Sequence, residues 1–390
     1  MSPKKIREII LPLKLVDIAL IVCNNANTEN DAGNDAGKTS HFPFGWFEMS
    51  KKRAVTIQNV AKAAGVSVST VSRVLNEKDD VSSDTQDRVR AVIDNLGYTS
   101  NLAARSMRSR KKNMIGLVVP DFGLYSFEIM RGVNKAIAES SFDLLAYTTG
   151  DSQKNGATLH EQNYVSLLSN SITDGVIIVA SGSAEFIANA PIVAVDPHII
   201  NPNYPAVQGM NYHGSLDVME YLISLGHRRI GFISGRPDAG TAERRLKGYQ
   251  DALANAGIEL EEELIAPGDF TQKTAYKCAR QLLTLDNPPT AIFAANDQSA
   301  LAVYQVAEEL GLQIPANLSV VGFDNISEAK HLGLTTVDQF LSEMGYLAVQ
   351  MLIKLINGES LEIEIHKMPT KLVVRNSCQK LIQTIQLQSG

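Results

Sequence analysis

Residues 55–98 read VTIQNVAKAAGVSVSTVSRVLNEKDDVSSDTQDRVRAVIDNLGY, and their spacing decides the fold of the N-terminal region. The apolar residues predicted to face inward from two short helices are Ile57, Val60, Ala61, Ala64, Val71, Val74 and Leu75. Gly65 ends the first helix, because the left-handed turn conformation costs glycine least. Ser67 caps the second helix through its hydroxyl. Two short helices joined by a tight glycine turn form a helix-turn-helix.

A third helix is predicted to follow. Its cap is Ser82-Ser83-Asp84, its buried residues are Val89, Val92, Ile93 and Leu96, and Gly97 closes it. The segment therefore reads as a three-helix headpiece.

The second helix exposes small, hydroxylated or basic residues, namely Val68, Ser69, Thr70, Ser72 and Arg73. Small side chains let a helix approach base edges, hydroxyls donate to phosphates, and Arg73 can pair with guanine O6 and N7. A generic three-helix bundle with a serine-rich surface explains the same residues. This segment alone does not decide between the two interpretations.

A short basic stretch, NLAARSMRSRKK at 101–112, follows the headpiece. It is too short to hold a helix alone in water, but DNA could stabilise it, with Arg105, Arg108 and Arg110 neutralising phosphates. Ala104 and Met107 would share one face, where an apolar wedge could enter a minor-groove step. The alternative is a solvated basic linker.

The charge distribution supports a nucleic-acid partner although the total does not. The 390-residue chain has 44% apolar and 20% charged residues and a net charge of −6, as in an ordinary globular protein. Between Met49 and Lys112, 13 Lys and Arg stand against 6 Asp and Glu, which leaves −13 for the remainder. A basic segment joined to an acidic body is typical of a DNA-binding module on a regulatory domain.

Other classes of site are disfavoured. Cys23, Cys278 and Cys378 lie far apart, so neither a disulfide framework nor a metal site is predicted, and no cofactor is expected. We interpret residues 1–48 as a disordered or non-essential extension or a misassigned start, because residues 24–40 are polar and rich in Gly and Asn and the chain from Met49 reads like a second start. Lys14 and Asp17 interrupt the apolar stretch at the start of the chain, so a signal peptide is not expected. A membrane span is therefore not expected.

Beyond Met114, apolar runs alternate with helical-period segments. The runs lie at 115–120, 142–147, 175–180, 191–195, 229–234, 290–295 and 318–323. This alternation predicts buried parallel strands with crossover helices, and the length favours two α/β lobes.

Ligands of such sheets bind beyond the carboxyl ends of the strands. The polar candidates there are Asp121, Ser234 through Arg236, Asn296, Asp297, Asp324 and Asn325, with Arg245 on a following helix. Carboxylates, an amide and a guanidinium together suit a polyol or sugar. Helix N-capping is the alternative for any one strand-end residue.

Three quoted segments resemble one known family. TIQNVAKAAGVSVSTVSRVLN at 56–76, LAARSMRSR at 102–110 and IGLVVPD at 115–121 look like the headpiece, hinge helix and first core strand of the lactose/galactose-repressor (LacI/GalR) family. The resemblance runs from about Val55 to Cys378. It implies a helix-turn-helix headpiece and hinge helix, followed by a two-lobed α/β core of parallel sheets like that of periplasmic binding proteins.

The resemblance also implies functional residues. The matching DNA-binding positions are Thr56, Val68, Ser69, Thr70, Ser72, Arg73, Asn76, Asn101, Ala104, Arg105, Met107 and Arg108. The matching effector-binding positions are Asp121, Tyr125, Phe127, Arg245, Asn296, Asp324, Gln339 and Leu341. Met107 departs from the usual intercalating leucine. Leu341 stands where an aromatic residue often stacks on the effector, and Phe340 could substitute for it.

The resulting hypothesis is a cytoplasmic, nucleoid-associated transcription regulator, expected to be a repressor, whose operator affinity is controlled allosterically by a small molecule. Its predicted parts are an extension at 1–48, a headpiece at 49–100, a hinge at 101–112, an effector-binding and dimerisation domain at 113–378 and a tail at 379–390. A homodimer would bind a pseudo-palindromic operator. The effector would be a sugar or, alternatively, a phosphorylated or purine-like compound, and it could act as inducer or corepressor.

Two rival functions are disfavoured. A periplasmic solute-binding protein would leave the headpiece and basic stretch unexplained. An enzyme on a nucleotide-binding fold lacks support, because no phosphate-binding glycine motif, nucleophile elbow or metal spacing follows any predicted strand. The prediction is therefore that the protein is not an enzyme.

Overall fold

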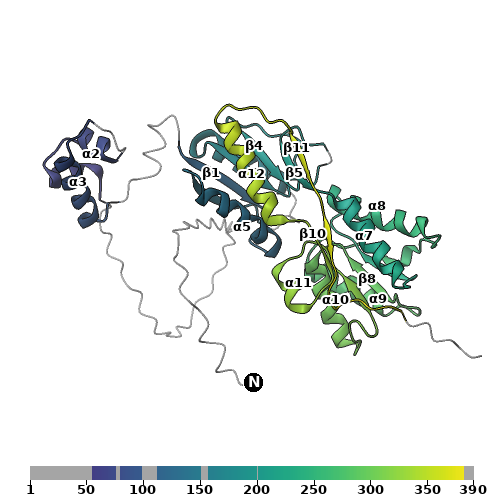
Figure 1. Cartoon of the computed structure of the whole chain (residues 1–390). Helices are drawn as coiled ribbons and strands as arrows, with labels where there is room; N and C mark the ends of the chain where they lie inside the picture. The colour runs from purple at the N-terminus through teal and green to yellow at the C-terminus, as the bar shows by residue number, and fades with distance from the viewer. Residues whose placement is uncertain (1–54, 76–79, 99–111, 151–156, 200, 382–390) are drawn as a thin grey trace, which may run out of the picture. The chain divides into compact units, whose positions relative to one another are not determined.

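The computed structural model describes residues 55–75, 80–98, 112–150, 157–199 and 201–381. Two compact units result: a small one, within 23–111, and a body that begins at Lys112 (Figure 1). The predicted extension at 1–48 and six of the predicted DNA-binding residues lie outside the described residues. Those six are Asn76, Asn101, Ala104, Arg105, Met107 and Arg108.

The small unit is the predicted three-helix headpiece. Its helices are α1 Ile57–Ala64, α2 Val68–Leu75 and α3 Ser83–Leu96. Val60, Val71 and Val89, one from each helix, are fully buried in a shared core. Gly65 ends α1 with φ 65°, as predicted, and the backbone N of Thr70 donates to Ser67 Oγ at 3.0 Å. The prediction for Leu96 was wrong: it lies in the last turn of α3, beyond the main core, and is 38% exposed.

The N-terminal lobe of the body is built on a six-stranded parallel sheet in the order β11-β5-β4-β3-β1-β2. Its strands are β1 Met114–Val119, β2 Asp143–Thr148, β3 Gly175–Val179, β4 Ile192–Val195, β5 Ala206–Gly209 and β11 Ile365–Met368. Its helices are α5 Leu124–Ala138, α6 Ala157–Leu167, a π-helix at Leu168–Ile172 and α12 Leu341–Ile356.

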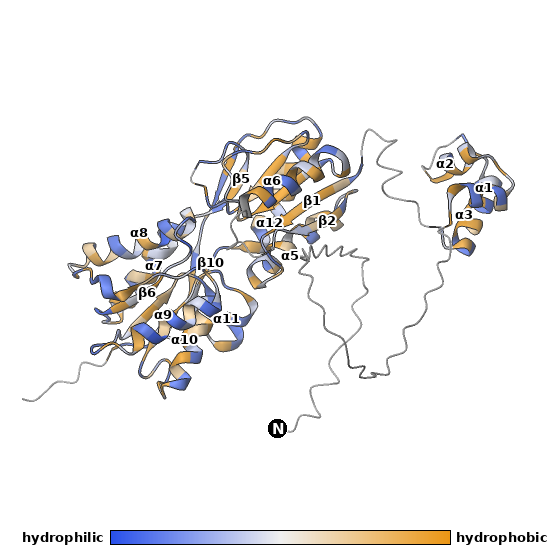
Figure 2. Cartoon of the chain, turned by 180° about the vertical axis from the view of Figure 1, so that it is seen from behind, coloured by the Kyte–Doolittle hydropathy of each residue, from blue (hydrophilic) through white to orange (hydrophobic). Residues whose placement is uncertain are grey.

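Strand side chains alternate between the two faces of this sheet. Leu117 and Val119 join the core formed with α5 and α12, whereas Val118 joins a second core with the π-helix residue Leu168. Both faces are therefore covered, which is why the strands appear in the sequence as continuous apolar runs. Figure 2 shows β1 and β6 in the hydrophobic colour, with the polar faces of the helices outside.

The C-terminal lobe is built on a four-stranded parallel sheet in the order β7-β6-β8-β9. Its strands are β6 Ile230–Ile233, β7 Ile265–Ala266, β8 Ala291–Ala294 and β9 Ser319–Val321, and a separate antiparallel pair is β10 Thr336–Asp338 with β12 Lys371–Val373. Its helices are α7 Asn211–Ser224, α8 Gly240–Asn255, α9 Gln272–Leu283, α10 Asp297–Glu309 and α11 Ser327–Leu332, with a 3-10 turn at Glu262–Leu264. One core packs α7 and α8 on the sheet, and another packs α9 and α10.

The seven predicted strands are all present, within two residues at their ends. The prediction missed β5, β7, β10, β11 and β12, which are two to four residues long. Several of them lie where the chain passes between lobes, at 209–211, 338–341 and 368–371. The two-lobed parallel architecture is confirmed, but each lobe is assembled from separated parts of the chain.

Helices α5 and α12 pack unusually closely. A Cβ on Gly132 of α5 would overlap the backbone oxygen of Ser342, and one on Gly345 of α12 would overlap that of Ile129. Glycine at these positions lets the two backbones meet. This packing seats α12 against the N-terminal lobe after the chain has left the C-terminal lobe.

No helix in the described ranges is long and apolar enough to cross a membrane. Across those same ranges, no group of His, Cys, Asp and Glu has a geometry that could hold a metal ion.

Candidate functional site

The exposed face of α2 carries the side chains predicted to meet DNA. Val68 is 38% exposed, and the Arg73 side chain is 56% exposed. The Nε of Arg73 lies 3.5 Å from Asp80 Oδ2, an exposed ion pair that contributes little to stability. A phosphate or guanine can therefore displace Asp80 at small cost.

The hydroxyls at the start of α2 are linked to one another. Ser67 Oγ lies 2.7 Å from Ser69 Oγ and 2.8 Å from Thr70 Oγ1. Thr56, another predicted DNA contact, is exposed and forms a capping box with Asn59, to whose Oδ1 its hydroxyl donates at 2.7 Å. These bonds orient the first turns of α1 and α2 and show a structural role for Thr56.

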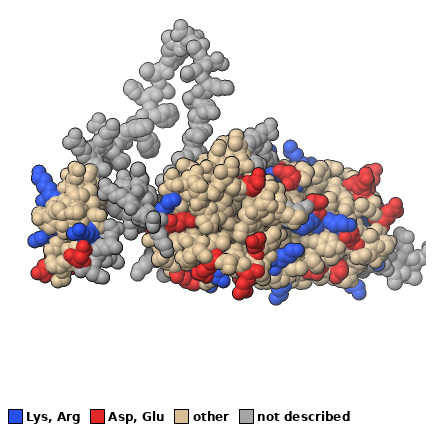
Figure 3. Space-filling model, turned by 90° about the horizontal axis from the view of Figure 1, so that it is seen from above, with Lys and Arg blue, Asp and Glu red and all other residues tan. Residues whose placement is uncertain are grey.

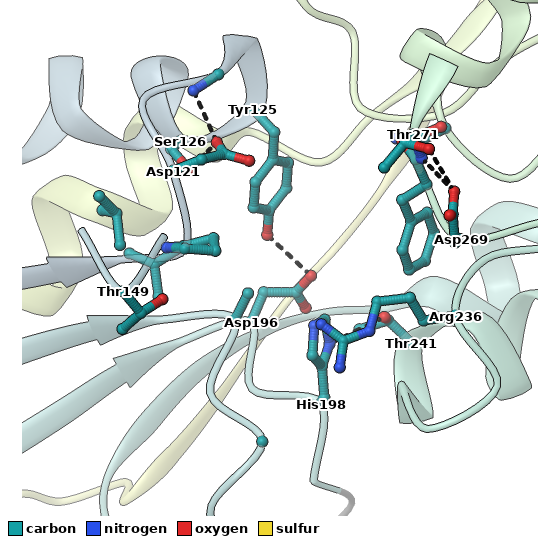
Figure 4. A pocket seen from close by; sticks show the side chains of 18 of the residues that line it. Asp121, Tyr125, Ser126, Thr149, Asp196, His198, Arg236, Thr241, Asp269 and Thr271 are labelled. Carbon is teal, nitrogen blue, oxygen red and sulfur yellow. Dashed lines mark hydrogen bonds between the residues drawn. The ribbon is translucent and has the colours of Figure 1, made fainter. Parts of the chain in front are cut away.

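The body contains a cavity of about 260 Å³ between its lobes, at the carboxyl ends of β1, β3, β4, β6 and β8. Its polar and aromatic lining includes Asp121, Tyr125, Ser126, Thr149, Glu161, Asp196, His198, Arg236, Asp238, Thr241, Arg245, Asp269, Phe270, Thr271, Asn296, Gln298 and Asp324. Figure 4 shows Tyr125, Asp196, His198 and Arg236 around this space. The strand-end rule therefore located the cavity correctly.

On the N-terminal side, the half-buried Tyr125 and the buried Asp196 form a hydrogen-bonded pair. The Tyr125 hydroxyl donates to Asp196 Oδ2 at 3.1 Å (Figure 4). Burial, followed by the negative charge of Asp196, raises the pKa of Tyr125 well above its usual value. Asp196 comes directly after β4, so the rule that singled out Asp121 and Asp324 would have found it, yet the prediction omitted it.

On the C-terminal side, Arg245 is 2% exposed and is held from several directions. Its Nε donates to Asn211 Oδ1 at 2.8 Å, its Nη1 donates to the Ala295 carbonyl, and its Cζ lies 3.8 Å from the centre of the Phe323 ring. Nη2 lies 3.6 Å from Asp324 Oδ1. These contacts fix the guanidinium in one orientation beside the cavity.

The carboxyl group of Asp324 is similarly constrained. Gln339 Nε2 donates to Asp324 Oδ1 at 2.7 Å. Burial raises the pKa of Asp324 to about 7, against the lowering effect of Arg245. Its backbone φ of 115° is one that non-glycine residues rarely adopt.

His198 and Arg236 line the wall beside Asp196. His198 Nδ1 lies 3.4 Å from Thr241 Oγ1, and burial lowers the pKa of His198 to about 4. The Nε of Arg236 donates to Asp238 Oδ1 at 2.9 Å. At neutral pH this wall therefore offers an uncharged imidazole and a guanidinium that is already paired.

Three of the predicted effector-binding residues do not line this cavity. Leu341 is 3% exposed and packs in the core of the N-terminal lobe, Phe127 is 57% exposed, and Gln339 is fully buried behind Asp324. None of the three lines the cavity, and neither does Phe340. The aromatic wall comes instead from Phe270, which follows the missed strand β7 and whose ring centre lies 5.7 Å from Arg245 Cζ.

Two other strand-end residues have the capping or structural roles given as alternatives. Asn296 lines the cavity, but its Oδ1 caps α10 by accepting from Ser299 N at 2.9 Å. Asp297 is fully buried outside the cavity and accepts from Thr336 Oγ1 at 2.6 Å. Asp297, one of the strand-end candidates, therefore has a structural role and does not line the cavity.

The face of the body that Figure 3 shows carries mixed charge. Figure 3 shows Lys and Arg interspersed with Asp and Glu over the visible face of the body. Such a surface has no large single-sign field to attract DNA.

Comparison with known proteins accounts for both units. Residues 56–101 match the model of bacterial regulatory proteins of the lacI family, and residues 219–378 match the periplasmic binding protein-like domain. The chain is 30% identical over 336 residues to the HTH-type transcriptional repressor PurR of Photobacterium profundum, covering 84% of this chain and 99% of that protein. It is 31% identical over 333 residues to catabolite control protein A of Priestia megaterium, covering 83% and 99%.

A solved structure agrees with these relatives. The transcriptional regulator CelR in complex with cellobiose aligns with a TM-score of 0.62 and 31% identity over 83% of this chain and 99% of that one. The predicted fold class and DNA-binding regulatory function are thereby confirmed, and the relative PurR is itself a transcriptional repressor. The chain, a DNA-binding transcription regulator with a ligand-binding body, belongs to the lacI family of bacterial regulatory proteins.

Proposed function

We propose that the cleft between the lobes binds a neutral, polyhydroxylated small molecule, a sugar or sugar derivative, and that this ligand controls the repressor's affinity for its operator. The observation that carries the proposal is the convergence of Asp196, Arg245 and Asp324 on one cavity beside the Phe270 ring. Carboxylate and guanidinium groups can each hold two adjacent hydroxyls, and an aromatic face packs against a sugar's C–H surface.

The charges favour a neutral ligand over a phosphorylated one. Arg236 and Arg245 are already paired with Asp238 and Asp324, and the Asp196 carboxylate adds negative charge. A phosphate would have to displace these pairs and approach a carboxylate. The complex of the related CelR with cellobiose is consistent with a carbohydrate in such a cleft.

In the headpiece, we assign base reading to Val68, Ser69 and Arg73 and phosphate contacts to Thr70 and Ser72. Two chains would present two α2 helices to a pseudo-palindromic operator in the cytoplasm. Light scattering of the full chain should give the mass of a homodimer. A monomer at micromolar concentration would contradict this part of the proposal.

A thermal-shift screen of the full chain tests the effector. Cellobiose, glucose, ribose, glucose 6-phosphate, hypoxanthine and guanine are compared at equal concentration. A neutral sugar should raise the melting temperature of the body, because binding to the folded state alone stabilises it. Arg245→Ala should abolish that shift, and Arg131→Ala, an exposed change on α5, should retain it. A shift only with the phosphate or the purines would overturn the sugar assignment.

A further inference from the structure

The point at which the chain enters the body is fastened by one carboxylate outside the cleft. Asp174 lies between the π-helix and β3, and its side chain accepts hydrogen bonds from the backbone N of Lys112 at 2.9 Å and 3.0 Å. It also accepts from the backbone N of Met114 at 3.3 Å. A carboxylate that accepts backbone N–H bonds forms charge-assisted contacts, which are stronger than neutral ones.

Further bonds hold the same turn. Lys112 Nζ donates to the carbonyl of Thr173 at 2.9 Å, and the backbone N of Asp174 donates to the Met114 carbonyl at 2.8 Å. Between the two anchored residues, Asn113 adopts φ 51°, a left-handed conformation that non-glycine residues rarely adopt. The direction in which the chain enters β1 is thus set by residues sixty positions later.

This junction and the cleft lie at opposite ends of the same two strands. β1 and β3 pair in parallel, with Ile115 opposite Gly175. Their amino ends adjoin Lys112 and Asp174, while Val119 and Val179 at their carboxyl ends line the cavity. A six-residue strand spans about 20 Å, so two buried, hydrogen-bonded strands connect the ligand cavity to the entry point.

We propose that Asp174 is a positioning residue that fixes the linker's attachment to the body, so that a shift of the N-terminal lobe is passed on to the DNA-binding unit. Residues 99–111 join Lys112 directly, so any mechanical coupling through the chain passes this point. The inference rests on the proposed function only in taking the cleft as the effector site. Its test needs no effector.

The test compares Asp174→Ala with Asp143→Ala in the full chain. Asp143 is the first residue of β2, so it lies, like Asp174, at the amino ends of the parallel strands. Its exposed side chain makes no hydrogen bond or ion pair with the described residues. Both changes remove one negative charge, so their long-range effects on DNA are matched. The probe is a duplex enriched from a random library by the unchanged chain, with a scrambled duplex for comparison.

Asp174→Ala should weaken binding to the enriched duplex by roughly tenfold relative to Asp143→Ala. Without Asp174 the chain at Lys112 is no longer ordered before DNA binds, so part of the binding free energy is spent on ordering it. Binding to the scrambled duplex and the salt dependence should be equal for both, since no phosphate contact is lost. Hydrogen exchange should accelerate at Lys112 and at Met114, the first residue of β1, but not in the rest of β1 or in β3.

Equal affinity of the two variants for the enriched duplex would overturn the proposal. So would faster exchange throughout β1 and β3, which would indicate a merely structural role. Asp174→Asn keeps the shape of the side chain and one acceptor oxygen, and it decides the question if Asp174→Ala does not fold. It should show an intermediate loss of affinity, and an affinity equal to that of Asp143→Ala would refute the proposal.

Discussion

Arg245 is the side chain through which the polar groups of the cleft are connected. Asn211 accepts from its Nε, and the Asn211 amide lies 3.4 Å from Asp196 Oδ1, so a chain of contacts runs from Asp196 to Asp324. Buried charges of this kind are stable only when each has its partners. A change in the charge or position of one of these side chains therefore also affects the side chains paired with it.

His198 should make the body sensitive to acid. Because burial lowers its pKa from 6.5 to about 4, the folded state binds this proton less readily than the unfolded state does. The stability it contributes is present above pH 6.5 and is lost as the pH falls towards 4, by roughly 3 kcal/mol at most.

Melting curves of the unchanged chain and of His198→Gln between pH 7 and pH 4 measure this effect. The unchanged chain should lose several degrees relative to the variant on acidification. The comparison cancels the opposite contribution of Asp324, whose pKa is raised in both proteins. His213→Gln, at an exposed site on α7, is the matched control and should follow the unchanged chain.

Arg73 should govern base preference in the headpiece. Removing a guanidinium that pairs with one guanine lowers discrimination at that base pair by about tenfold. The measurement is the ratio of dissociation constants for the enriched duplex and for duplexes with single base changes. Arg73→Ala should reduce one such ratio, whereas Arg88→Ala, an exposed change on α3, should leave all of them unaltered. Uniform weakening on every duplex would show that Arg73 contacts phosphate instead.

At the scale of elements, the close pairing of α5 and α12 holds the N-terminal lobe together. α12 follows β10 of the C-terminal lobe directly, yet it packs in the other lobe, against β3, β4 and α5. Two helices can pack this closely only where both have glycine, which lacks a side chain, at the point of contact. Glycine is normally unfavourable inside a helix, so its presence at these two positions is explained by the packing and not by helix propensity.

Gly132→Ala should destabilise the body severely, although alanine normally favours a helix. The added methyl group would overlap the Ser342 carbonyl, so α5 and α12 would have to separate and forfeit buried contacts of both helices. Thermal unfolding should show a large drop in melting temperature. Asn134→Ala, at an exposed position of the same helix, should change it little. Equal melting temperatures would mean that the helices can shift without cost.

At the scale of the whole molecule, DNA binding and ligand binding are divided between two compact units. The basic residues are concentrated in 49–112, and the rest of the chain is acidic. Coupling between the two functions is reciprocal: an effector that lowers operator affinity must itself bind less tightly in the presence of operator.

A chain lacking residues 49–112 should lose binding to the enriched duplex completely. Its body should still unfold cooperatively, because the described cores of the two lobes contain no residue before Met114. Fluorescence anisotropy measures the first result, and calorimetry measures the second. Specific DNA binding by the shortened chain would refute the division of function.

What the sequence determined by itself was local. The headpiece helices, their glycine turn and the seven predicted strands follow from apolar patterns over fewer than fifteen residues, and the strand-end rule placed Asp121 and Asp324 in the cleft. Only the tertiary structure decided which neighbouring side chain faces the ligand. It placed Phe270 on the wall and Leu341 in the core, and it joined Asp174 to Lys112. The physical reason is that the position of each of these side chains depends on contacts between residues tens to hundreds of positions apart. Some of those contacts are made by short strands, whose apolar pattern is too brief to be recognised in the sequence.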